Sequence, residues 1–141
     1  MVANLKILGK PVGKGRPKFS RQGAFVNTYT PDKTLVYENF VKMLWIESGQ
    51  QKLHGAILVE IIANFKIPAS VSKKKRELMK GEYYTHKPDA DNIAKIVLDP
   101  LNGLAFDDDS QVVVLTVSKI YSDTDEEYVE LNLTEADYNG D

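Results

Sequence analysis

The segment GAILVEIIANFKIP, residues 55–68, decides the fold because its hydrophobic residues recur at every second position. All the odd positions from 57 to 67 are apolar, while the polar residues Glu60 and Asn64 fall on the even face. A period of two is typical of a strand with one face against a core. The segment therefore predicts a long β-strand. Its apolar face would consist of Ile57, Val59, Ile61, Ala63, Phe65 and Ile67.

The residues before this strand predict one helix and two short strands. The segment 30–48, TPDKTLVYENFVKMLWIES, starts like a helix, with Thr30 as N-cap and Pro31 in the first helical position. Residues 4–9 and 24–29 are typical of short strands. The helix should bury one broad stripe in the core or in a dimer interface. That stripe consists of Val36, Tyr37, Phe40, Val41, Leu44 and Trp45.

Between the two short strands, residues 9–23 read GKPVGKGRPKFSRQG. Glycine, proline and basic residues alternate there without an apolar period, which predicts an extended, mobile loop.

The residues after the long strand predict two helices and two strands. Residues 70–81 are typical of a short basic helix, capped by Ser70 or Ser72. Residues 89–104 form a second helix, which Pro100 should kink or end. Polar and apolar residues then alternate in residues 112–122 and 127–136, which predicts two strands. DTDE at 123–126 is expected to join them as a hairpin. The order β-β-α-β-α-α-β-β indicates one α+β domain over residues 1–141, with a mixed β-sheet flanked by helices.

Composition excludes several classes of protein. The chain has 141 residues and no cysteine, so disulfides, thiolate nucleophiles and cysteine–zinc sites are excluded. No apolar run is long enough to span a membrane, and the first residues resemble neither a signal peptide nor a transit peptide. We therefore expect a cytoplasmic protein with no membrane partner.

The charges are divided unevenly along the chain. Up to residue 80 there are fifteen Lys and Arg against five Asp and Glu, and after it three against fifteen, so the halves carry +10 and −12. This asymmetry indicates a basic surface for a polyanion and a separate acidic centre that could hold a cation. The alternative is an acidic tail on an otherwise neutral protein.

The acidic residues form two tight groups. Asp89 and Asp91 directly precede the second predicted helix, and Asp107 to Asp109 directly precede a strand, so the two groups could converge. Crowded carboxylates repel one another, and a bound divalent ion relieves the repulsion. Oxygen ligands favour Mg²⁺, or Mn²⁺, over zinc. An EF-hand beginning at Asp89 is excluded, because its glycine and glutamate positions hold Ala94 and Pro100. The alternative is that the first pair merely caps the helix.

Lys95 follows Asp91 by one helical turn. Two interpretations remain open for this lysine. It could form an ordinary ion pair with Asp91 along the helix, or it could stabilise negative charge on a phosphate bound beside a metal ion.

Basic residues elsewhere suggest nucleic acid as the substrate. Glycines alternate with cations in the first loop, and a second basic group begins the short helix at residue 73, so both could follow a phosphate backbone. The alternative is that they are solvated surface residues. The candidate DNA-binding residues are Lys14, Arg16, Lys18, Arg21, Lys73, Lys74, Lys75, Arg76 and Lys87.

The segment DADNIAKIVLDPLNGLAFDDDSQVV, residues 89–113, resembles the RusA-type Holliday junction resolvases, which are found largely in phages and prophages. It is similar to the D-x-D-N-x-x-K helix and the DD-x-Q-V turn of that family. Weaker similarity extends to GKGRPKF at 13–19, YTPDKT at 29–34 and the pair Tyr37–Glu38. One departure is THKP at 85–88, where some members of the family carry a run of arginines.

The resemblance implies a homodimeric, RusA-like nuclease that cuts Holliday junctions during DNA recombination and repair. Paired symmetric nicks would depend on Mg²⁺, or Mn²⁺, and leave 5′-phosphate and 3′-hydroxyl ends. The implied metal ligands are Asp89, Asp91 and Asp109, Lys95 is the implied catalytic lysine, Asp108 is a neighbouring acid, and Asp107 is an additional acid. Three alternatives are a nuclease with another nucleic-acid preference, a DNA-binding protein whose acids hold a structural divalent ion without cleavage, and a protein-interaction module.

Overall fold

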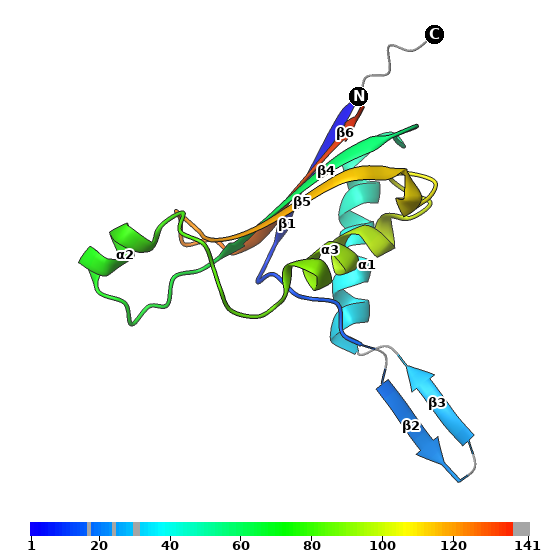
Figure 1. Ribbon diagram of the computed structural model, residues 1–141, viewed down its shortest axis with the longest axis horizontal. Helices are drawn as coiled ribbons and strands as arrows, with labels where there is room; N and C mark the ends of the chain where they lie inside the picture. Colours follow the sequence, from blue (N-terminus) through cyan, green and yellow to red (C-terminus); the bar gives the residue numbers. More distant parts are fainter. Residues whose placement is uncertain (17, 24, 30–31, 137–141) are drawn as a thin grey trace.

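A computed structural model describes residues 1–16, 18–23, 25–29 and 32–136 (Figure 1). Its main sheet has four strands in the order β1-β6-β4-β5. β4 pairs with β5 in parallel and with β6 in antiparallel orientation, and β6 also pairs antiparallel with β1. The predicted α+β fold with a mixed sheet is therefore confirmed. The strands are β1 (Val2–Leu8), β4 (Ile57–Phe65), β5 (Val112–Tyr121) and β6 (Tyr128–Glu135).

β4 lies inside the sheet and alternates as its sequence predicts. Its odd-numbered residues from Ile57 to Phe65 are buried, and Glu60 is exposed on the other face. Asn64 departs from this alternation, since its side chain is only 4% exposed. Its amide donates hydrogen bonds to the carbonyl oxygens of Ile62 and Tyr128, which satisfy the buried polar group.

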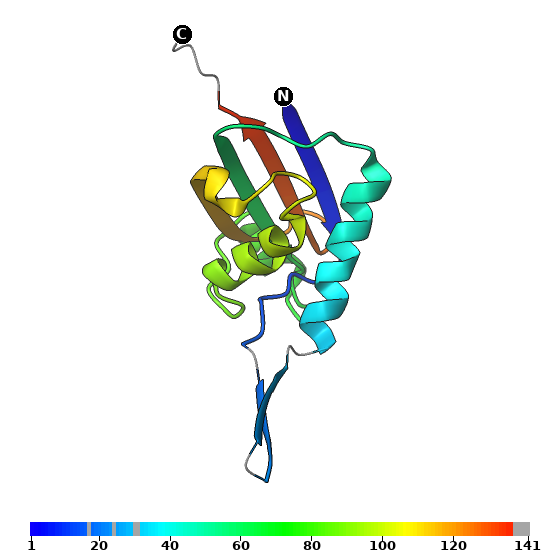
Figure 2. The ribbon, with the colours of Figure 1, turned by 90° about the vertical axis from the view of Figure 1, so that its right-hand side faces the viewer.

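Helices α1 (Asp32–Ser48) and α3 (Ala90–Leu98) cover one face of the sheet (Figure 2). α1 buries Tyr37, Val41 and Trp45 in the core, whereas Val36 and Phe40 are exposed, so the core accounts for only part of the expected stripe. Burial of the rest in a dimer interface stays a prediction. One side of α1 packs on the sheet and α3. In the described part of the chain no further layer covers its opposite side, so residues on that side remain exposed. The expected helix start at residues 30–31 lies outside the described residues.

α3 ends at Leu98, and Pro100 stands in the 3-10 helix η1 (Asp99–Leu101) that follows, as the sequence predicts. The basic helix α2 (Lys73–Met79) is also confirmed, and the side chain of Ser72 accepts a hydrogen bond from the backbone N–H of Lys75. α2 buries none of its residues and projects from the end of the sheet (Figure 1). Within the residues that the structure describes, no helix has the length and hydrophobicity to cross a membrane.

The first loop departs from its prediction. Residues Lys18–Gln22 form strand β2, which pairs antiparallel with β3 (Phe25–Tyr29) in a hairpin that extends away from the main sheet (Figure 1). Gly23 has φ of +62° at the turn, a conformation that two-residue hairpin turns require. The apolar alternation that signals a strand is absent from the sequence of this segment, so its composition favours a loop.

The predicted hairpin between the last two strands is wrong. β5 and β6 are not neighbours, since β4 lies between them. Residues 122–127 cross the end of β4, where the N–H of Ser122 donates a hydrogen bond to the carbonyl of Phe65. A short polar connection fits either topology, because two strand spacings amount to only about 10 Å.

Candidate active site

A pocket of 350 Å³ opens between α3, β5 and the 3-10 helix η2 (Asp109–Gln111). Its polar lining consists of Asp91, Lys95, Asp99 and Asp109. Apolar side chains of α3 and β5 form the remaining wall, namely Ala94, Leu98, Val112 and Leu115. Two acidic segments that are separate in sequence thus contribute to one concave site, which is the usual form of a small-ligand or catalytic site.

The helical repeat explains three of the polar residues. Asp91, Lys95 and Asp99 follow one another at four-residue intervals, so they share one face of α3 and its continuation into η1. Asp109 reaches the pocket from the turn before β5. Its backbone N–H donates a hydrogen bond of 2.8 Å to the side-chain oxygen of Asn102, which ties this turn to the end of η1.

Lys95 and Asp91 do not form the ion pair that their spacing allows. Both side chains are exposed, and within the described residues neither makes an ion pair or a side-chain hydrogen bond. The structure therefore does not contain the ion pair between Lys95 and Asp91 that was the first interpretation of this lysine. Its ammonium is available to a ligand of the pocket.

Asp89 stands just outside the pocket lining. It occupies the N-cap position of α3, yet its side chain makes no cap hydrogen bond. Instead its carboxylate lies 2.9 Å from the Nζ atom of Lys87. The hydrogen bond from Lys87 lowers the pKa of Asp89 below its ordinary value, so this carboxylate remains ionised.

The other two acids of the second group are engaged away from the pocket lining. The carboxylate of Asp107 lies 2.8 Å from Nζ of Lys52, and that hydrogen bond lowers the pKa of Asp107. Asp108 caps η2 by accepting a hydrogen bond from the N–H of Ser110. Hydrogen bonding by the side chain of Ser110, and then by this N–H, lowers the pKa of Asp108. Of the three, only Asp109 lines the pocket. Its role as a metal ligand stays a prediction.

The donor set suits a magnesium ion that is only partly held by protein. Within the described ranges, no three His, Asp or Glu side chains are grouped closely enough to hold a metal ion by themselves. However, Asp91 and Asp109 both face one pocket. Mg²⁺ is commonly bound by one or two carboxylates, with water and substrate phosphate as the other ligands. The residues present therefore fit this ion, whereas they do not form a closed metal cage.

Asp99 lines the pocket although it is not among the residues predicted from the sequence, and it pairs with Lys14. Nζ of Lys14 lies 2.6 Å from Oδ2 of Asp99 and 3.2 Å from Oε2 of Glu38. The sequence predicts that Lys14 contacts DNA, but its ammonium is already shared by two carboxylates. Burial lowers the pKa of Lys14, and the bonds to Asp99 and Glu38 outweigh this effect, so the net pKa is raised. The signal for Asp99 is its position one turn after Lys95 on the same helical face.

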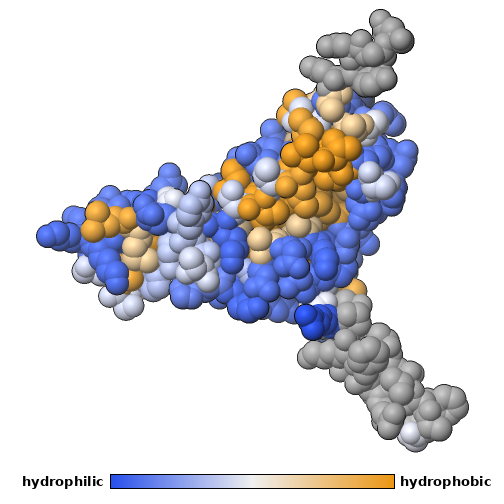
Figure 3. Space-filling view, viewed as in Figure 1, coloured by the Kyte–Doolittle hydropathy of each residue, from blue (hydrophilic) through white to orange (hydrophobic). Residues whose placement is uncertain are grey.

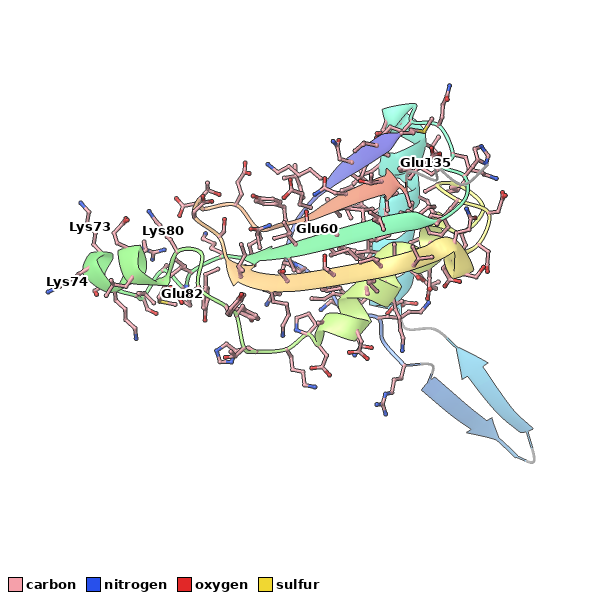
Figure 4. All side chains as sticks on the ribbon, turned by 45° about the horizontal axis from the view of Figure 1, so that its top comes forward. Glu60, Lys73, Lys74, Lys80, Glu82 and Glu135 are labelled. Atoms are coloured by element: carbon pink, nitrogen blue, oxygen red, sulfur yellow. The ribbon has the colours of Figure 1, made fainter. Side chains whose placement is uncertain are left out.

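The other expected DNA-binding residues lie on separate parts of the molecule. Lys73, Lys74 and Lys75 are exposed on α2, and the first two extend away from the sheet in Figure 4. Arg76 donates hydrogen bonds to the backbone carbonyls of residues 67 and 68. Lys87 pairs with Asp89 and Arg16 is exposed. Lys18 and Arg21 lie on β2, whose side chains are outside the described part of the structure.

Comparisons with known proteins identify the family of the chain. The family model for endodeoxyribonuclease RusA matches residues 9–132, which include the whole pocket. The uncharacterized protein YqaN of Bacillus subtilis (strain 168) is 35% identical over 122 residues, which cover 83% of this chain and 86% of YqaN. The match to the family extends from the loop after β1 into β6 and thus covers most of the fold. The chain belongs to the RusA family of endodeoxyribonucleases.

Proposed function

We propose that this protein is a metal-dependent endonuclease that resolves Holliday junctions by paired, symmetric nicking. The observation that carries this proposal is the convergence of Asp91, Lys95 and Asp109 on one pocket. Membership of the RusA family supports DNA as the substrate and hydrolysis of a phosphodiester bond as the reaction. A cytoplasmic role in recombination and repair is consistent with that reaction.

Phosphodiester hydrolysis needs an activated water molecule and stabilisation of the charge that develops on the phosphate and the leaving oxygen. A bound Mg²⁺ or Mn²⁺ ion supplies both effects when it is present. Asp91 and Asp109 would hold it through carboxylate oxygens, with Asp89 nearby as the third acid that the resemblance implies. Lys95 would place its ammonium against the scissile phosphate, where it stabilises the transition state more than the ground state.

A homodimer would match the twofold symmetry of the junction and provide two sites for two nicks. The open face of the sheet supports this part of the proposal. Leu58 and Val114 are register partners on neighbouring strands, and their side chains are 37% and 50% exposed. Val113 and Val114 are exposed residues of β5, and Figure 3 shows an apolar surface over this strand. An exposed apolar patch on an edge strand is typical of a protein–protein interface.

DNA would be held by basic residues outside the pocket. The exposed lysines of α2 and the exposed Arg16 are suited to phosphate contacts, because neither group is enclosed by acidic partners in the described part of the structure. Lys87 could contribute once its pair with Asp89 opens.

The test is cleavage of a labelled synthetic four-way junction with Mg²⁺, beside a linear duplex built from the same strands. The proposal expects two symmetric nicks in the junction only, with none in the Asp91→Asn variant or with EDTA. Junction binding without cleavage in either Mg²⁺ or Mn²⁺ would instead favour a DNA-binding protein. Cleavage of flaps or RNA structures in preference to the junction would identify a nuclease with another substrate.

A further inference from the structure

The side chain of Lys14 connects three parts of the molecule. It comes from the loop after β1, Glu38 comes from α1, and Asp99 comes from η1 at the edge of the pocket. The side chains of Lys14, Glu38 and Asp99 are 29%, 14% and 35% exposed, respectively. Charge-assisted hydrogen bonds are shorter and stronger than those between neutral groups, so these contacts join the three parts of the molecule at the edge of the pocket.

The backbone beside Lys14 is fixed as well. The N–H of Lys14 donates a hydrogen bond of 2.9 Å to the carbonyl of Asn92 in the first turn of α3. A Cβ atom at Gly13 would lie 2.8 Å from Cβ of Pro88 and 3.1 Å from Cβ of Asn92, closer than side chains pack. This part of the loop is therefore docked against the amino end of α3 and is not the mobile segment that its composition predicts.

Asp99 has a second cation within its reach. It follows Lys95 by four residues, and its backbone N–H still donates to the carbonyl of Lys95 as in a continuous helix. Side chains at this spacing are neighbours on a helix surface and readily form ion pairs. Nevertheless Asp99 pairs with Lys14, and Lys95 has no ion-pair partner in the described residues.

We propose that Lys14 is a positioning residue that holds the Asp99 carboxylate away from Lys95. Asp99 is thereby prevented from neutralising the lysine that lines the pocket. This inference rests on the proposed function, because it assigns Lys14 a purpose through the phosphate-binding role of Lys95. Glu38 fixes the other side of the Lys14 ammonium and anchors the triad to α1.

Two roles for Lys14 predict different kinetics. If Lys14 positions Asp99, Lys14→Met should lower kcat for junction cleavage by roughly tenfold or more, because Asp99 then pairs with Lys95. The junction Kd and its dependence on salt should change little. If Lys14 itself contacted a phosphate, the Kd would rise and the salt dependence would weaken, and this result would overturn the proposal.

The decisive variant is the double substitution Lys14→Met with Asp99→Asn. Removal of the Asp99 charge should restore kcat to within about twofold of the Asp99→Asn single variant. Lys14→Arg should retain the ion pairs and the activity. A double variant as slow as Lys14→Met would contradict a positioning role.

A crystal structure of Lys14→Met gives a readout that does not depend on cleavage. The Asp99 carboxylate should move to within about 4 Å of Nζ of Lys95, whereas in the matched control Glu38→Gln it should stay on Lys14. An unmoved Asp99 would refute the inference even in an active nuclease. Conversely, a wild-type protein that cuts no junction would refute the proposed function while this structural comparison still decides the role of Lys14.

Discussion

Asp91 in the first turn of α3 and Asp109 at the start of η2 line the same pocket, although the rest of α3, η1 and a loop separate them along the chain. The hydrogen bond from the N–H of Asp109 to the side chain of Asn102 fixes the distance between the two segments. The proposed metal site requires such carboxylates on separately anchored elements, because a binding site must be held in place by its supporting structure.

The clearest prediction concerns which aspartate of the second acidic group, Asp107 to Asp109, acts in the pocket. Asp109→Asn should lower junction cleavage by at least about a hundredfold, since even loss of an outer-sphere partner can cost that much. Asp107→Asn is the matched control, because it removes an equal charge that is paired with Lys52 outside the pocket lining. Cleavage rates under single-turnover conditions and junction binding by gel shift would separate the two. Equal losses in both variants would show that the assignment of Asp109, rather than Asp107, to the active site is wrong.

Lys95 should act on the rate rather than on binding. Its ammonium faces the pocket without an ion-pair partner among the described residues. We therefore expect Lys95→Met to lower kcat by about a hundredfold and to change the junction Kd by much less. Lys75→Met on α2 removes the same charge from an exposed site and should show the opposite pattern. If Lys95→Met altered only the Kd, Lys95 would be a binding residue.

The lysines of α2 should contribute to DNA affinity through counterion release. Replacing Lys73 and Lys74 by glutamine should weaken junction binding and reduce the slope of log K against log salt by about one unit for each phosphate that the lysines neutralise. The measurement is a salt titration by fluorescence anisotropy in the Asp109→Asn background. Lys42→Gln on the exposed side of α1 is the control. An unchanged slope would place the DNA elsewhere.

Tyr37 offers a test of the core that is independent of function. Its hydroxyl is buried and, within the described part of the chain, has no hydrogen-bond partner. Burial also raises the pKa of Tyr37, so the hydroxyl stays protonated at any ordinary pH. Tyr37→Phe removes an unsatisfied polar atom and should raise the free energy of unfolding by about 1 kcal/mol. A loss of stability in urea denaturation would mean that the hydroxyl has a partner in solution.

The sequence predicts those features that depend on local patterns. The period of two in β4, the cap of α2 and the end of α3 before Pro100 are all local, and all are confirmed. The pairing of β5 with β4 rather than with β6 depends on contacts between distant segments, which no local pattern encodes. β2, which belongs to a separate sheet with β3, carries no strand pattern in its sequence.

In the candidate site, too, local patterns predict some features, whereas others depend on tertiary contacts. The helical repeat brings Asp91 and Lys95 to one face, and motif similarity points to Asp109. The ion-pair partner of each charged residue, however, depends on the tertiary structure. Lys14 is a candidate DNA contact in the sequence, yet the fold places it between Glu38 and Asp99. Charge patterns identify which residues are ionic, but they do not reveal which of them are already neutralised.

The last prediction concerns assembly. β5 is an edge strand, and Leu58 and Val114 form an apolar patch on the sheet face that α1 and α3 leave open. If this patch is the dimer interface, Val114→Glu should give monomers in sedimentation velocity, because an unpaired charge is costly to bury. The monomer should also lose paired nicking, since one subunit presents one site. Leu78→Glu adds the same charge at an apolar residue of α2 that is 73% exposed, and it should leave the dimer intact. A dimer that survives Val114→Glu would place the subunit contact on another surface.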